Sequence, residues 1–268
     1  MKGTALILAG GGGKGAYEIG VWKSMIECGA DRNISAVSGA SVGGLNGALF
    51  AQGDYQAAER IWLAMSEEKI LTPGKKTLLE GLREIGENGL LAEAADALRE
   101  GMFTRQGLIQ IIRQELDVKK IRDRQMPCYA ACYNTTKNLV DYINMTGMTQ
   151  NDMETVLLAT SALPGVFEPV RFGRSLYLDG GLKDNVPVRP LYNAGYRDFL
   201  VIHLSSQGSV DEADFPGASI AQIIPSEDQG DFMTGTLDFS RDGARRRLKQ
   251  GYEDGKRFFE EIQKRDEL

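Results

Sequence analysis

Histidine and cysteine are scarce in this sequence. The 268 residues include one histidine, His203, and three cysteines, Cys28, Cys128 and Cys132. If residues 126–133 form a strand, Cys128 and Cys132 lie roughly 13 Å apart, which is too far for a disulfide bond. We therefore expect buried free thiols, and the low cysteine count favours a reducing compartment, the cytoplasm.

Long apolar runs and an excess of basic residues are also missing. No run approaches the ~20 apolar residues that a membrane-spanning helix needs. The net charge of −6 argues against a general nucleic-acid binder, because that affinity comes mainly from Lys and Arg. Residues 1–15 lack the pattern of a signal peptide. We therefore interpret the terminal RDEL and the Asn-x-Ser/Thr sequences at Asn33, Asn134 and Asn144 as chance, since both matter only in a secreted chain.

The order of apolar runs predicts an α/β fold. Hydrophobic residues make up 42% of the chain and charged residues 25%, which is ordinary for a globular protein. Strand-like runs at 3–10 and 34–39 alternate with helical patterns at 15–29 and 42–53, as in a parallel sheet with right-handed crossovers. We expect further strands at 128–133, 138–145, 175–181 and 198–206, the first two of them paired, and further helices at 55–65 and 151–163.

We expect a single domain over residues 1–268, since no repeat, low-complexity tract or linker divides the chain. Residues 66–103 combine apolar residues at helical spacing with several glycines, which predicts short amphipathic helices. These are either ordinary core helices or a mobile cap. Apolar residues on one face from Ala244 to Ile262 predict a closing helix over about 240–264.

A glycine-rich stretch separates the first strand from the first helix. It runs from Gly10 to Gly13 and continues with Lys14 and Gly15. Backbone N–H groups at such a junction can converge on an anion, and side chains would block that approach. The stretch also fits the G-x-G-x-x-G pattern of dinucleotide-binding loops, although no acidic residue ends the second strand. A non-enzymatic nucleotide-binding module therefore stays open as an alternative.

A second motif places a serine at a strand-to-helix turn. Gly39, Ser41 and Gly43 fit the pattern G-x-S-x-G. The two glycines permit the strained turn that lifts a serine hydroxyl clear of a sheet, and the following helix would stabilise negative charge at Ser41.

A third motif places a carboxylate at the end of a strand. Asp179 ends an apolar run and is followed by Gly180 and Gly181. Parallel-sheet proteins keep catalytic groups at this edge, although Asp-Gly is also a common turn pair. Serine attack on an ester needs a nucleophile, a base and donors for the oxyanion. Ser41, Asp179 and the glycine-rich stretch supply one each.

The single histidine leaves a rival mechanism open. The order Ser41, Asp179, His203 matches that of an α/β-hydrolase triad. However, His203 lies inside the apolar run 198–206, where a structural histidine is the simpler interpretation. A Ser-His-Asp esterase remains the alternative.

In combination, these motifs resemble those of the patatin-like phospholipases. GGGGKG, GASVG and DGG occur in that family's order and spacing, and ATSALPGVFEPV precedes the aspartate, so the resemblance covers residues 4 to about 204. It implies a three-layer α/β/α sandwich with a mostly parallel central sheet. It also implies a Ser–Asp dyad without histidine, metal or cofactor, with Ser41 as nucleophile and Asp179 as general base. The amides of Gly10, Gly11 and Gly12 would form the oxyanion hole.

The resemblance further implies a lipid acyl hydrolase that cleaves acyl esters of phospholipids, lysophospholipids or related lipids. Lys14 fills the family's basic position, where it either braces the loop or touches a lipid phosphate. Peripheral contact with a membrane fits this function, whereas a nucleic-acid partner does not. Residues 66–103 match no family motif. The sequence leaves the head group and the oligomeric state open.

Overall fold

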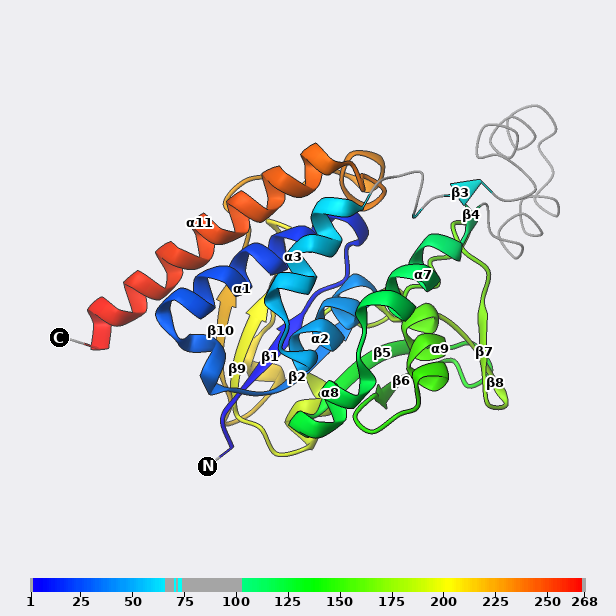
Figure 1. Cartoon of the computed structure of the whole chain (residues 1–268). Helices are drawn as coiled ribbons and strands as arrows, with labels where there is room; N and C mark the ends of the chain where they lie inside the picture. Colours follow the sequence, from blue (N-terminus) through cyan, green and yellow to red (C-terminus); the bar gives the residue numbers. More distant parts are fainter. Residues whose placement is uncertain (1, 66–69, 71, 74–102, 267–268) are drawn as a thin grey trace.

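An eight-stranded sheet forms the centre of the computed structural model (Figure 1), which describes residues 2–65, 70, 72–73 and 103–266. Most of the segment 66–103, with its predicted helices and cap, lies outside the described residues. The strands of the sheet are β1 (Thr4–Leu8), β2 (Ile34–Ala40), β5 (Cys128–Asn134), β6 (Leu139–Asn144), β7 (Val170–Phe172), β8 (Ser175–Asp179), β9 (Asp198–Ile202) and β10 (Ser219–Ile223).

The sheet is mostly parallel, in the order β10-β9-β1-β2-β5-β8-β7. The four pairs from β10 to β5 are parallel, while β6 and β8 pair with β5 in the antiparallel direction, as does β7 with β8. The predicted parallel pairing of the first two strands and the predicted pairing of 128–133 with 138–145 are both confirmed. A separate two-stranded sheet joins β3 (Thr72–Pro73) to β4 (Phe103–Thr104).

Helices flank the sheet. They are α1 (Ala16–Cys28), α2 (Val42–Gln52), α3 (Tyr55–Ala64), α7 (Gln106–Glu115), α8 (Val118–Arg124), α9 (Gln150–Thr160), α10 (Arg189–Asn193) and α11 (Arg241–Asp266). Their ends follow the local sequence: the Asp54 carboxylate accepts the Ala57 N–H at the start of α3, and α1 ends at Gly29 with φ of 77°.

Alternating strand residues face two separate apolar cores. Leu6 and Leu8 of β1 lie in the larger core, together with residues of α1, α2, α3 and α9. Ala5 and Ile7 face the other way, into a smaller core that α10 and the chain around Phe215 cover. The predicted α/β fold with a mostly parallel sheet and helices on its faces is therefore confirmed. The layer over the smaller core is thin, because α10 has only five residues.

The C-terminal helix lies along the first helix of the chain. Figure 1 shows α11 running beside α1 on the outside of the larger core. The Tyr17 hydroxyl of α1 donates a hydrogen bond to Asp254 of α11, at 2.9 Å. The closing helix expected over 240–264 corresponds to α11.

The three cysteines are free thiols, as expected. Cys128 and Cys132 are buried in β5, whereas Cys28 at the end of α1 is exposed, so the prediction of burial was wrong for Cys28. Cys28 is the last residue of α1 before Gly29, and it faces solvent.

Strand β5 brings the ends of two other strands together. Strands β2 and β8 share one edge of β5, because β6 occupies the other edge along most of its length. Ala40, the last residue of β2, lies opposite Ala131, and Asp179, the last residue of β8, lies opposite Cys132. The two strands therefore approach from opposite directions and end at neighbouring positions.

Candidate active site

Ser41 stands in a strained turn directly after β2. Its backbone has φ of 52° and ψ of −125°, a conformation that side-chain-bearing residues seldom adopt. A Cβ atom at Gly39 would collide with the backbone of Gly43, so the turn can close only with glycine there. The Ser41 N–H donates to the Thr160 hydroxyl at 3.0 Å, and that hydroxyl donates to the Ala131 carbonyl at 2.5 Å. These bonds tie the turn to α9 and β5.

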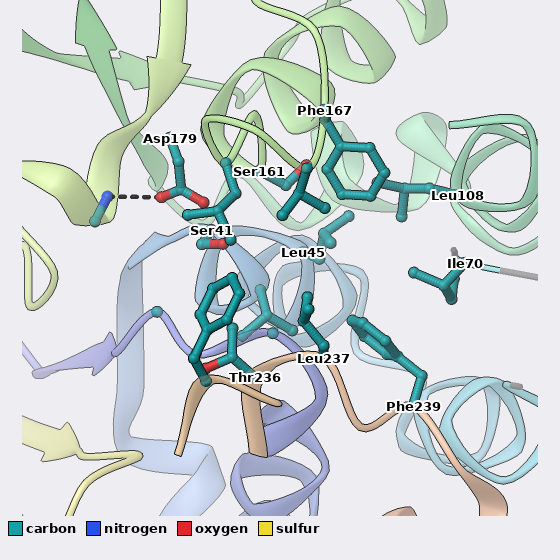
Figure 2. Close-up of a pocket in the computed structure, with 18 of the residues that line it drawn as sticks. Ser41, Leu45, Ile70, Leu108, Ser161, Phe167, Asp179, Thr236, Leu237 and Phe239 are labelled. Carbon is teal, nitrogen blue, oxygen red and sulfur yellow. Dashed lines mark hydrogen bonds between the residues drawn. The ribbon is translucent and has the colours of Figure 1, made fainter. Parts of the chain in front are cut away.

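Asp179 is buried beside Ser41. The residue is only 3% exposed, and its carboxylate accepts the Gly181 N–H at 2.7 Å. Burial raises the pKa of Asp179 to about 6, while contacts with the Ser41 side chain and the Gly181 N–H oppose that rise. Figure 2 shows the Ser41 and Asp179 side chains next to one another at one side of a cavity. The pair combines a hydroxyl with a base whose pKa is close to neutral.

The glycine-rich stretch lies on the same cavity, but its amides are not equivalent. The Gly10 N–H donates to the Asn185 carbonyl at 3.1 Å, and the Asn185 side chain donates back to the Gly10 carbonyl at 3.1 Å. Gly11 and Gly12 line the cavity at the start of the short helical turn η1 (Gly12–Gly15). The first N–H groups of a helical turn have no hydrogen-bond acceptor within the turn itself. The amide of Gly10, one of the three expected in the oxyanion hole, is therefore already engaged.

The glycines also make room for a distant segment of the chain. Cβ atoms at Gly12 and Gly13 would collide with the carbonyl oxygens of Thr236 and Asp238. The interpretation that these glycines keep amides bare for an anion is thus incomplete. At Gly10 and Gly11 as well, a Cβ atom would collide with the side chains of Asn185 and Leu204, so protein fills the space beside all four glycines.

The cavity has a volume of about 290 Å³ and mostly apolar walls. Figure 2 shows Ser41 and Asp179 at one side, with Leu108, Phe239 and Ile70 farther along. Other apolar residues that line it are Leu45, Trp62, Met65, Val166, Phe167 and Leu237. A cavity of this kind suits one hydrocarbon chain with its ester held at the polar end.

A buried polar network connects the glycine turn to the cavity wall. The Asn46 side chain donates to the Glu18 carboxyl at 2.7 Å and to the Gly15 carbonyl at 3.0 Å, and it accepts the Trp62 indole N–H at 3.0 Å. Burial raises the pKa of Glu18 well above its usual range, while the hydrogen bond from Asn46 opposes that rise. The network holds Trp62 and the turn in one arrangement.

His203 does not line the cavity. It follows β9, which β1 separates from β2, and its Nε2 lies 2.9 Å from the Gln222 side-chain oxygen. The residue is 1% exposed, and burial lowers its pKa. These contacts agree with the interpretation of a structural histidine.

Lys14 is not among the residues that line the cavity either. A Cβ atom at Gly235 would collide with its side chain, so Lys14 passes directly beneath the segment that carries Gly235. Burial lowers the pKa of Lys14, and the charges of Asp228 and Asp231 oppose that change. Of the two roles left open by the sequence, this position supports bracing the loop.

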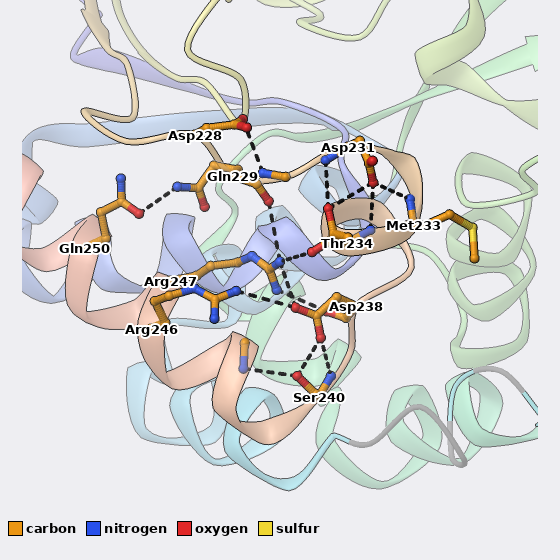
Figure 3. Close-up of polar contacts among 12 residues, drawn as sticks. Asp228, Gln229, Asp231, Met233, Thr234, Asp238, Ser240, Arg246, Arg247 and Gln250 are labelled. Carbon is orange, nitrogen blue, oxygen red and sulfur yellow. Dashed lines mark hydrogen bonds and ion pairs between the residues drawn. The ribbon is translucent and has the colours of Figure 1, made fainter.

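The segment 229–239, which forms part of the cavity wall, is held by a buried arginine of α11 (Figure 3). Arg247 is 1% exposed and pairs with the Asp238 carboxylate at 2.9 Å. Its guanidinium also donates to the carbonyls of Asp238 at 3.1 Å, Thr234 at 2.9 Å and Gln229 at 3.4 Å. One side chain of α11 therefore fixes the segment that packs on the glycine turn.

Sequence reasoning missed several contributors to this site. Asn185 and Thr160 hold the two backbone turns, and the segment 229–239 closes one side of the cavity. Asn185 belongs to the DGGLKDN sequence, so its nearness to Asp179 was a signal. No motif pointed to 229–239. Within the ranges that the structure describes, no cluster of three or more His, Cys, Asp or Glu side chains could hold a metal ion.

The model of the patatin-like phospholipase family matches residues 6–192. The chain belongs to this family. The matched part contains the glycine-rich stretch, Ser41 and Asp179, and it ends before the segment 229–239 and α11. Membership of the patatin-like phospholipases confirms the resemblance inferred from the motifs.

Several relatives carry the same kind of domain in much longer chains. Patatin-like phospholipase domain-containing protein 7 of Mus musculus is 25% identical over 216 residues, covering 80% of this chain and 14% of that protein. Lysophospholipase NTE1 of Cryptococcus neoformans is 26% identical over 207 residues, covering 77% and 11%. Human patatin-like phospholipase domain-containing protein 6 is 25% identical over 207 residues, covering 77% and 14%. The chain thus spans a small part of each of these relatives.

Among solved structures, VipD from Legionella pneumophila resembles this patatin-like chain in fold. The TM-score is 0.50 at 14% sequence identity, and the match covers 97% of this chain and 67% of VipD. At this identity the likeness concerns the fold alone.

The first prediction concerns the cost of burying Asp179. The pKa of Asp179 is about 6 in the folded chain and 3.8 in the unfolded chain. Protonated Asp179 therefore stabilises the fold fully below pH 3.8, and this stabilisation is lost as the pH rises through about 6. Asp179→Asn keeps an acceptor for Gly181 and never ionises. We expect it to raise the free energy of unfolding at pH 8 by about 1–3 kcal/mol.

Urea unfolding at pH 8 and at pH 4 measures this effect. The gain should shrink toward zero at the lower pH, and an equal gain at both values would contradict it.

The second prediction concerns Arg247. Arg247→Met removes the charge that pairs with Asp238 and leaves three carbonyls without their donor, so we expect a loss of about 2–4 kcal/mol in the free energy of unfolding. The matched control is Arg245→Met on the same helix, since Arg245 is exposed and, among the residues that the structure describes, pairs with Asp242 of α11. Its effect should stay within about 0.5 kcal/mol. Equal losses of unfolding free energy in the two variants would contradict the prediction, because the buried contacts of Arg247 would then stabilise the fold no more than those of an exposed arginine.

Proposed function

We propose that this chain is a serine lipid acyl hydrolase that cleaves carboxylic esters with a Ser41–Asp179 dyad. The observation that carries the proposal is the meeting of a strained serine and a buried carboxylate at one side of an apolar cavity. Family membership supports the reaction class, and relatives named phospholipase and lysophospholipase support a lipid substrate.

In the proposed reaction, the Ser41 hydroxyl attacks the ester carbonyl while Asp179 accepts its proton. The N–H groups of Gly11 and Gly12 stabilise the negative charge that develops on the carbonyl oxygen. Collapse of this intermediate breaks the bond to the alcohol, which takes the proton from Asp179, and leaves an acyl group on Ser41. Asp179 then takes a proton from water, whose oxygen attacks the acyl carbonyl. The bond between the acyl carbon and the Ser41 oxygen then breaks, and that oxygen takes the proton back from Asp179. A free fatty acid leaves, and Ser41 and the ionised Asp179 are regenerated.

The environment of Asp179 explains why this chemistry needs no histidine. An ordinary aspartate is too weak a base to take a proton from a serine, because a base works best when its pKa lies near the working pH. Burial moves the pKa of Asp179 to about 6, close to the value that a histidine would have. The same raised pKa lets the protonated form return its proton to the leaving alcohol.

The apolar walls support an acyl chain as the part of the substrate that the cavity holds. Leu108, Phe167 and Phe239 offer hydrocarbon contact without specific polar groups. A nucleotide would find few partners there. The segment 229–239 also packs directly against Gly12 and Gly13 of the glycine turn. The nucleotide-binding alternative therefore has no support in this arrangement.

The third prediction tests the dyad. We expect Ser41→Ala and Asp179→Asn each to lower kcat/KM on a soluble short-chain ester by at least about 10³-fold, and the double variant to be little worse, because the two residues act as a unit. A fluorophosphonate probe should label wild-type protein at Ser41. If Asp179→Asn keeps most of the activity, the dyad is wrong even if the probe labels Ser41.

The fourth prediction separates the dyad from a triad. Because Asp179 must be ionised to act as base, kcat/KM should fall about tenfold per unit of pH below pH 6. A histidine base would produce a similar acid limb, so the pH profile alone does not distinguish the two. We expect His203→Gln to keep at least a third of wild-type turnover and the same acid limb.

Circular dichroism should first show that His203→Gln is folded, since His203 is buried against Gln222. A loss of about 10³-fold in the folded variant would assign the base to His203 and replace the dyad with a triad.

A further inference from the structure

Exposed apolar side chains gather at the rim of the candidate active site. Phe232 is 49% exposed, Met233 55% and Leu182 45%. Phe232 and Leu182 also line the cavity that holds Ser41 and Asp179, although they come from different parts of the chain. The apolar surface of the cavity therefore continues outward onto the surface of the protein.

The turn that carries Phe232 and Met233 is firmly held. It is a single helical turn, η5 (Phe232–Thr236), and the Asp231 carboxylate accepts the N–H groups of Met233 and Thr234, both at 2.8 Å. The buried guanidinium of Arg247 holds the Thr234 carbonyl from below. Figure 3 shows Met233 projecting away from these contacts. The exposure of the two side chains is thus imposed by an ordered turn.

We infer that Phe232, Met233 and Leu182 form a docking rim that enters the surface of a zwitterionic lipid aggregate. This inference rests on the proposed function: a lipid ester must pass from its aggregate into the cavity, and a continuous apolar path lets its acyl chain do so without crossing water. Continuity with the cavity is what selects a lipid as the occupant of this surface. Exposed apolar groups beside such an opening are typical of interaction sites.

Charge favours a zwitterionic surface over an anionic one. Asp228 and Asp231 both precede the turn, a single lysine, Lys183, follows Leu182, and the whole chain carries a net charge of −6. Anionic lipids attract clusters of Lys and Arg, which this turn lacks between Asp228 and Leu237. The apolar contact must therefore supply most of the affinity.

Met233 offers the sharpest test, because it is the most exposed of the three and does not line the cavity. The full chain is mixed with phosphatidylcholine vesicles, and bound protein is measured by flotation. We expect Met233→Ser to lower the partition coefficient about fivefold and Met233→Trp to raise it. The rate on vesicle lipid, divided by the rate on a soluble short-chain ester, should change in the same direction.

Leu139→Ser is the matched control. Leu139 is also 45% exposed, but it lies on β6 and does not line the cavity. The Leu139→Ser variant should leave unchanged both the partition coefficient and the ratio of the rate on vesicle lipid to the rate on the soluble ester. Equal losses in Leu139→Ser and Met233→Ser would overturn the inference, because any exposed apolar residue would then suffice.

Other results also overturn it. Wild-type protein that ignores phosphatidylcholine vesicles, or binds only vesicles containing phosphatidylglycerol, contradicts a zwitterionic docking rim. A dimer in solution that Met233→Ser converts to a monomer would make this surface an interface between copies of the chain. If vesicles bind as expected but neither ester is hydrolysed, the docking rim stands and the proposed function fails.

Discussion

Strands β2 and β8 reach the same edge of β5 from opposite directions, and the candidate site depends on that meeting. Each strand ends where the other would continue, at Ala131 and Cys132 of β5. The residue after β2 is Ser41 and the last residue of β8 is Asp179, so hydrogen bonds of the sheet set the distance between them. Had the chain run β8 parallel to β2, the carboxylate would lie at the far end of the strand. The proposed dyad is thus a consequence of one antiparallel pair added to a parallel sheet.

Both members of the proposed dyad are held in states that cost free energy. Ser41 has a positive φ, and Asp179 keeps a carboxylate in a buried place. The surroundings compensate for these costs: Thr160 binds the Ser41 N–H, and Gly181 donates to the carboxylate. The residues around the pair therefore keep two unfavourable groups side by side, which is the usual relation between a catalytic site and the stability of its fold.

The glycine-rich stretch shows how far local reasoning could reach. Its place between a strand and a helix was predictable, because an apolar run ended there and a helical pattern began. Its partners were not. Gly10 is engaged by Asn185, and Gly12 and Gly13 lie against residues more than 220 positions later in the chain. Pattern and propensity describe neighbours in sequence, whereas these contacts form only when the last helix has folded back along the first. For the same reason Lys14 could not be assigned to the loop or to a lipid before the segment above it was placed.

By itself, the sequence determined the order of strands and helices, the position of Ser41 at a turn and of Asp179 at a strand end, and the family to which these motifs belong. These features follow from local periodicity, glycine spacing and the chemistry of single residues. Only the tertiary structure decided that Asp179 is buried enough for its pKa to reach about 6, that His203 faces Gln222 instead of Ser41, and that Arg247 of α11 holds a wall of the cavity. Burial and proximity depend on all the segments that pack around a residue, and those segments come from both ends of the chain.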